Sequence, residues 1–145
     1  MPYDQNYRYR NLHSMFNTIL FPIDRSRESR EAVEVVSNLV SQNHSRLFIL
    51  SVIQPEDPSP TRSSPDVVEE LLQDARSLFI KQGIQAETIE RSGKPAFTIC
   101  DVADEVQADL IIMGTRGLGL TSDSPHESVT TRVISLSPCP VLVVP

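Results

Sequence analysis

A chain of 145 residues, 39% of them hydrophobic, is long enough to bury one core and too short for two domains. Thirteen lysines and arginines against nineteen aspartates and glutamates give a net charge of −6, which argues against nonspecific binding to nucleic acid or an anionic membrane surface. No apolar run approaches the roughly 20 residues that cross a bilayer, and the N-terminus is polar, so we expect a cytoplasmic protein.

The chain begins its regular structure with an alternation of strand and helix. Residues 18–23 form a short apolar run, predicted as a buried strand, that ends at Asp24. Apolar residues then recur at helical spacing as far as Val40, which predicts an amphipathic helix that begins near Ser26. A second apolar run at 47–53 predicts the next buried strand.

The same alternation continues to the end of the chain. The proline-rich segment 54–64 predicts a flexible loop that proteases cut first at Arg62, and Pro65 opens a helix that Gly83 ends. Segment 84–91 alternates apolar and polar residues, as a strand does when one face is exposed or when it lies at a sheet edge. The remaining elements are a helix from Pro95 to Val106, a strand at 110–114, a helix from Val129 to Leu136 and a strand at 141–144. Five strands with four intervening helices predict an α/β fold with a doubly wound parallel sheet.

The segment 113–133 is the best candidate for a binding site. A predicted strand ends at Gly114, a loop with Gly117 and Gly119 follows, and a helix opens near Ser128. Backbone N–H groups and the helix dipole at such a junction attract a phosphate. Glycines in a loop also serve turn geometry, so both interpretations stay open.

These residues resemble the nucleotide-binding branch of the universal stress protein family, which carries G-x-x-G, nine residues, and then G-[ST] after its fourth strand. The chain has Gly114, Gly117, nine residues and then Glu127 and Ser128, so the spacing matches while Glu127 replaces one glycine. The resemblance covers residues 17–144 through the segments ILFPID, LSVI, ADLIIMGTRG, SVTTRV and PCPVLVV.

The resemblance implies a single Rossmann-like sheet of strand order 3-2-1-4-5 and a site for ATP or AMP at its carboxyl edge, where Asp24 and Gly114 would meet. By resemblance the adenine lies against Pro22, Asp24 and Val52, the ribose against Met113 and Gly114, and the phosphates against Gly117, Ser128, Val129 and Thr130. Other roles remain open: a carboxylate at a helix start for Asp24, core packing for Pro22, Val52 and Met113, and helix capping for Ser128 and Thr130.

Glu127 departs from the family pattern at the phosphate end of this site. A carboxylate about 5 Å from a phosphate charge costs roughly 3 kcal/mol at an effective dielectric of 20. We therefore expect a preference for adenosine or AMP over ATP. Asp123 adds to the negative charge, Arg116 and Arg132 offset it, and a Mg²⁺ ion between Glu127 and the phosphates would reverse the effect.

Catalytic and metal sites are not indicated. His13, His44 and His126 are scattered along the chain, without metal-ligand spacing or a Ser-His-Asp arrangement. The expected function is a non-catalytic adenine-nucleotide-binding protein that regulates a stress response. The alternatives are a dimeric interaction module without ligand and a slow ATP hydrolase or nucleotidyl transferase.

Two further expectations concern the ends of the chain. Residues 1–14 lie outside the resemblance and are expected to form a flexible or surface-packed extension, or an aromatic and basic arm that contacts ligand, ahead of a domain at 15–145. The apolar strand 141–144 would leave an open sheet edge, so we expect a homodimer in which this strand pairs with its mate.

Overall fold

The computed structural model describes residues 15–24, 29–55, 65–114 and 128–145. The strands are β1 (Thr18–Pro22), β2 (Arg46–Ile53), β3 (Ala86–Ser92), β4 (Leu110–Gly114) and β5 (Val141–Val144). The helices are α2 (Ser29–Asn43), α3 (Pro65–Ile80), α4 (Pro95–Glu105) and α5 (Val129–Leu136). No helix in these ranges is long and apolar enough to cross a membrane. The predicted extension 1–14 and residues 56–64 of the predicted loop lie outside the described residues.

The five strands form one parallel sheet in the order β3-β2-β1-β4-β5, which confirms the predicted topology. The central strand β1 pairs with β2 over its whole length, from Thr18 opposite Arg46 to Pro22 opposite Leu50. On its other side, Leu20 of β1 lies opposite Ile111 of β4. Since β1, β2 and β4 are covered on both faces, their runs of buried apolar residues follow from their central position.

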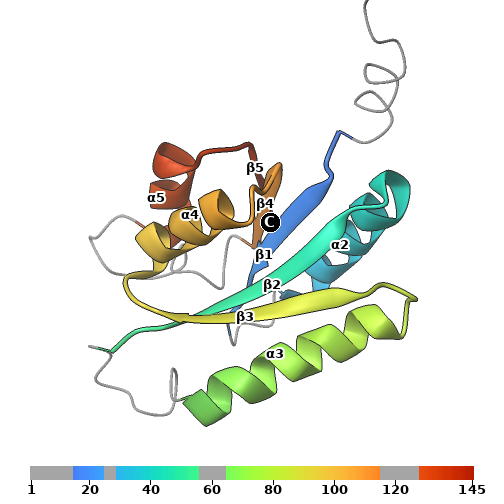
Figure 1. Cartoon of the computed structure of the whole chain (residues 1–145), viewed down its shortest axis with the longest axis horizontal. Helices are drawn as coiled ribbons and strands as arrows, with labels where there is room; N and C mark the ends of the chain where they lie inside the picture. Colours follow the sequence, from blue (N-terminus) through green and yellow to red (C-terminus); the bar gives the residue numbers. More distant parts are fainter. Residues whose placement is uncertain (1–14, 25–28, 56–64, 115–127) are drawn as a thin grey trace, which may run out of the picture.

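Helices cover both faces of the sheet (Figure 1). One face, which we call the α2/α3 face, packs on α2 and α3, and its core contains Phe21 and Phe79 with ring centroids 6.0 Å apart in an edge-to-face arrangement. The other, the α4/α5 face, packs on α4 and α5 through residues that include Leu50, Met113 and Val133. Successive side chains of a strand point to opposite faces, so each strand supplies both cores.

Element ends differ from the sequence predictions by a few residues. The helix α3 ends at Ile80 rather than continuing to Gly83, which has a φ of 76° in the turn that follows. Strand β3 begins at Ala86 instead of 84 and lies at the sheet edge, as its alternating pattern indicates. Strands β4 and β5 have the predicted bounds.

Three contacts hold the chain where it enters β1, at the amino edge of the sheet. The N–H of Thr18 donates to a carboxylate oxygen of Asp109 at 2.9 Å, and the N–H of Arg46 donates to the carbonyl of Asn17 at 2.7 Å. The Ser45 hydroxyl donates to the carbonyl of Phe16. These contacts place residues 16–18 beside the start of β2.

Candidate functional site

The candidate site lies at the carboxyl edge of the sheet, where β1 and β4 are neighbours. β1 and β4 are far apart in the sequence, but the sheet order places them side by side. Their last residues, Pro22 and Gly114, therefore close two adjacent parallel strands at the same edge. The helices that follow these strands lie on opposite faces, which is the topological switch point where ligands bind in open α/β sheets.

The β1 side of this edge continues toward β2. The Ile23 N–H donates to the Leu50 carbonyl at 2.8 Å, so the chain follows β2 beyond the end of β1 and brings the half-buried Asp24 to the edge. Val52 is also half-buried and packs against the core of the α4/α5 face. Pro22 is buried. The residues predicted to border adenine thus share one edge, and core packing accounts for part of their surroundings.

On the β4 side, a buried side chain is followed by a glycine with space beside its backbone. Met113 is fully buried in the core of the α4/α5 face, so its side chain has the packing role that the sequence left open. A Cβ atom on the next residue, Gly114, would meet no described atom within 4 Å. Within the described part of the chain, there is room beside the backbone at the end of β4.

Helix α5 begins beside this edge with a well-formed N-terminal cap. The Ser128 hydroxyl accepts a hydrogen bond from the Thr131 N–H at 3.1 Å and lies 2.8 Å from the Thr131 hydroxyl. Its carbonyl accepts from the Arg132 N–H at 3.1 Å. Ser128 is therefore a helix cap, and the helix it starts directs its positive dipole end toward the site.

Thr130 is not a cap. Its side chain lies in the first turn of α5 with 1% of its surface exposed, and its hydroxyl has no hydrogen-bond partner among the described residues. Buried hydroxyls normally have partners, because leaving one unsatisfied costs about 1–3 kcal/mol. A threonine in a first helical turn is usually exposed, so no sequence pattern reveals this burial. Its neighbour Val129, the first residue of α5, is half-buried.

The glycine loop between β4 and α5 lies outside the described residues. Gly117, Glu127 and the charged residues Arg116 and Asp123 all belong to it. The structure therefore brings the described candidate residues together at the carboxyl edge of the sheet: Pro22, Asp24, Val52, Met113, Gly114, Ser128, Val129 and Thr130. The positions of Gly117 and Glu127 stay a prediction.

The described histidine and cysteines are not among the predicted site residues. The described residues contain no group of three or more His, Cys, Asp and Glu side chains that could hold a metal ion. His44 is exposed between α2 and β2. Cys100 and Cys139 are free thiols that pack against the core of the α4/α5 face, and burial raises the pKa of both, with Asp101 adding to the effect at Cys100.

Comparisons with known proteins agree with this fold. A model described as the universal stress protein family matches residues 15–145. A universal stress protein of Synechocystis sp. is 57% identical over 136 residues, which cover 90% of this chain and 87% of the relative. A solved universal stress protein in complex with cAMP has a TM-score of 0.73 at 23% identity and covers 90% of this chain and 97% of its own. A solved universal stress protein from Archaeoglobus fulgidus in complex with dAMP has a TM-score of 0.69 at 21% identity, over 88% of this chain and 97% of its own.

The identification rests on the extent of these matches. The family model spans all nine described helices and strands, and the Synechocystis relative is identical at more than half of the aligned positions. The observed strand order is the one that the resemblance implies. This chain belongs to the universal stress protein family.

Proposed function

We propose that this protein binds an adenine nucleotide at the carboxyl edge of β1 and β4 and that the bound nucleotide regulates a stress response without being chemically converted. The observation that carries the proposal is the buried Thr130 hydroxyl, which lies in the first turn of α5 and has no partner among the described residues. A phosphate at the start of α5 would meet the positive end of the helix dipole, and its oxygen would accept a hydrogen bond from the Thr130 hydroxyl once the groups that cover this buried atom move aside.

Two further observations support the same site. No described atom lies within 4 Å of a Cβ built on Gly114, which favours approach of a ligand to the backbone, and the switch point between β1 and β4 is the general location of ligands in such sheets. Relatives of the same fold have been solved with cAMP and dAMP, both adenine nucleotides with one phosphate. Both ligands belong to the class of ligand that we propose for this site.

We attribute that preference to Glu127, the residue directly before the cap Ser128. Its carboxylate repels the additional charge of a triphosphate, whereas the adenosine half of the site is unaffected. Replacing the carboxylate in the variant Glu127→Gly should strengthen ATP binding by roughly 1–3 kcal/mol, about five- to hundredfold in affinity, and should change AMP binding far less.

The experiment begins with the purified protein. Absorbance and chromatography after denaturation reveal any adenine nucleotide that it carries. Calorimetric titration of the parent and Glu127→Gly proteins with AMP and ATP, with and without Mg²⁺, then measures the preference. Tighter ATP than AMP binding by the parent protein without metal would contradict the repulsion, and absence of binding by both proteins would favour the ligand-free interaction module. A requirement for Mg²⁺ would favour an ion that bridges Glu127 and the phosphates.

The use of the Ser128 hydroxyl supports the non-catalytic part of the proposal. The Ser128 hydroxyl is engaged in the helix cap, so its position serves the fold of α5 rather than attack on a phosphate. Incubation with Mg²⁺ and ATP, followed by chromatography of the nucleotide, tests this. Turnover above that of a Ser128→Ala variant would contradict it.

We also propose a homodimer through β5. This strand lies at the sheet edge and exposes 37% of Leu142, and an unpaired apolar edge favours pairing with a second copy. Light scattering at micromolar concentration should give twice the chain mass. A monomer would contradict this proposal without affecting the nucleotide site.

A further inference from the structure

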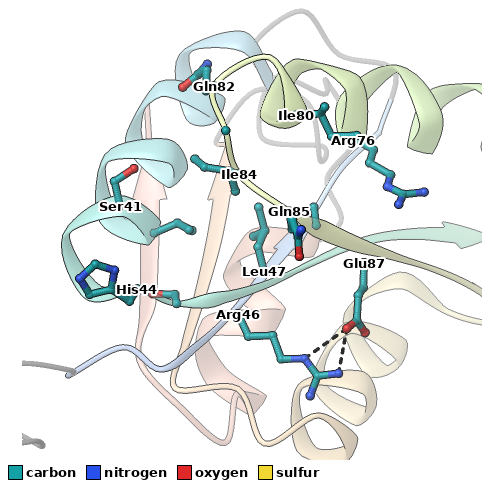
Figure 2. A pocket seen from close by; sticks show the side chains of 14 residues that line it. Ser41, His44, Arg46, Leu47, Arg76, Ile80, Gln82, Ile84, Gln85 and Glu87 are labelled. Carbon is teal, nitrogen blue, oxygen red and sulfur yellow. Dashed lines mark hydrogen bonds and ion pairs between the residues drawn. The ribbon is translucent and has the colours of Figure 1, made fainter.

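A hollow lies at the amino edge of the sheet (Figure 2), whereas the proposed nucleotide site is at the carboxyl edge. It has a volume of ≈ 890 Å³, within the range of about 300–1,000 Å³ typical of pockets that hold ligands. Its walls come from the ends of α2 and α3 and from the starts of β2 and β3. We call this hollow the amino-edge pocket.

The amino-edge pocket has an apolar floor and a polar rim. Leu47, Ile84 and Gln85 lie in the middle of the view, and Ser41 and Gln82 lie farther out (Figure 2). Beside them Ile80, the last residue of α3, leaves 53% of its surface exposed. A group with an apolar body and a hydrogen-bonding tip suits such a lining.

The charges around the pocket do not select an anion. Arg46 is neutralised by Glu87, whose carboxylate lies 2.8 Å from its guanidinium. Helices α2 and α3 both end here, and their C-termini carry partial negative charge that opposes an anion and favours hydrogen-bond donors. Arg76 adds one positive charge to the wall. The pocket is therefore close to electrically balanced, and an uncharged donor such as a phenol fits it better than a phosphate or a carboxylate.

The chain itself brings such groups to the rim. The carbonyls of Phe16 and Asn17 accept hydrogen bonds from Ser45 and Arg46, and both of these residues line the pocket. The fourteen residues before this anchored stretch contain all three tyrosines of the protein, at positions 3, 7 and 9. Ten residues extend to at most about 35 Å, so the distance from the anchor does not limit Tyr7.

We propose that the N-terminal segment 1–14, which lies outside the described residues, docks in the amino-edge pocket through its tyrosine side chains. The rings cover Ile80 and the apolar floor, and their hydroxyls donate to polar groups of the rim. Attachment at Asn17 gives the segment a high effective concentration at the pocket, so even weak contacts suffice. Docking here would hold the segment at the edge away from the proposed nucleotide site, so it is an alternative to the ligand-contacting arm that the sequence left open.

The test uses the intrinsic fluorescence of the full chain. With three tyrosines and no tryptophan, the emission reports on residues 3, 7 and 9 alone. Docking should lower the acrylamide quenching of the parent protein well below its value in concentrated urea. The variant Ile80→Lys places a charge on the apolar wall and should weaken docking about tenfold, which moves the quenching toward the urea value.

A matched control lies on the same helix. Leu78 is 41% exposed on α3 but does not line the pocket, so Leu78→Lys should leave the quenching unchanged. Lysine is well tolerated near a helix C-terminus, so both variants should keep the fold, which circular dichroism checks. Pairwise Tyr→Phe substitutions leave one emitter each and identify the docked ring.

Three results would overturn the proposal. Quenching of the parent protein equal to that in urea would mean that the tyrosines are free. If Ile80→Lys and Leu78→Lys changed the quenching equally, a surface other than the pocket would protect the tyrosines. Loss of protection on dilution to monomer would mean that the segment occupies the pocket of a second copy.

Discussion

The two faces of the sheet are built differently. On the α2/α3 face the helices have 15 and 16 residues and seal a continuous apolar core around Phe21 and Phe79. On the α4/α5 face the helices have 11 and 8 residues and cover a smaller core. The longer helices cover the larger core, whereas the shorter α5 begins at the candidate site.

Each face also buries one hydroxyl that has no partner within the described residues, Ser37 on α2 and Thr130 on α5. Only Thr130 lies at the edge where a ligand is proposed. Under the proposed function, the Thr130 hydroxyl gains a partner when nucleotide binds, whereas the Ser37 hydroxyl stays without one.

The largest expected effect is on the free energy of unfolding, when a phenylalanine on each face is replaced by alanine. Phe79→Ala removes a fully buried ring from the α2/α3 core and should lower the free energy of unfolding by about 3–5 kcal/mol. Phe97→Ala, at a position 49% exposed in α4, should change it by less than about 0.5 kcal/mol. Urea unfolding monitored by circular dichroism measures both. Comparable losses would show that the α4/α5 face contributes to stability as the other face does.

An intermediate effect is expected from the two hydroxyls. Ser37→Ala removes an unsatisfied group and places a better helix former in α2, so it should raise the free energy of unfolding by about 1 kcal/mol with or without nucleotide. Thr130→Val should also stabilise the nucleotide-free protein, but it should weaken AMP binding about fivefold because the donor to the phosphate is lost. Unfolding curves and calorimetric titration of both variants measure this. Unchanged AMP affinity in Thr130→Val would mean that Thr130 does not contact the nucleotide. The Thr130 hydroxyl would then be a buried group without a ligand partner, as Ser37 is.

The smallest effect concerns the two thiols of the α4/α5 face. Burial raises the pKa of Cys100 and of Cys139 above the usual value of 9.0, so the folded state holds these protons more strongly than the unfolded state. Their contribution to stability is complete below pH 9.0 and is lost as the pH rises through the raised folded-state pKa values. Urea midpoints from neutral to alkaline pH should therefore decline less in the variant Cys100→Ala, Cys139→Ala than in the parent. An identical decline would assign the alkaline loss to other groups.

Most of the fold was predictable because its signals are local. The apolar run at 110–114 and the run at 141–144 give β4 and β5 with correct bounds, since buried parallel strands read as short apolar stretches. Helix ends were less certain: Gly83 marks the turn after α3, but the last helical residue is Ile80. Glycine marks a turn without specifying how many residues precede it.

The site was predictable in part. A strand end at Gly114 and a helix start at Ser128 are visible in the sequence, and the fold brings them to one edge. The burial of the Thr130 hydroxyl depends on tertiary packing around α5, which no local pattern contains. The amino-edge pocket was missed for the same reason, because its lining comes from the ends of four separate elements.

The central position of β1 has a consequence for synthesis on the ribosome. Translation delivers β1 first, yet one neighbour, β4, comes near the end of the chain, and the bond from Thr18 to Asp109 spans 91 residues. At about 5–20 residues per second, the apolar stretch of β1 waits several seconds for that neighbour. During that interval only β2 can shield it, with α2 across one face. The nascent chain should therefore depend on chaperones until β4 has emerged, and a ribosome-bound chain truncated before residue 110 should remain sensitive to proteolysis.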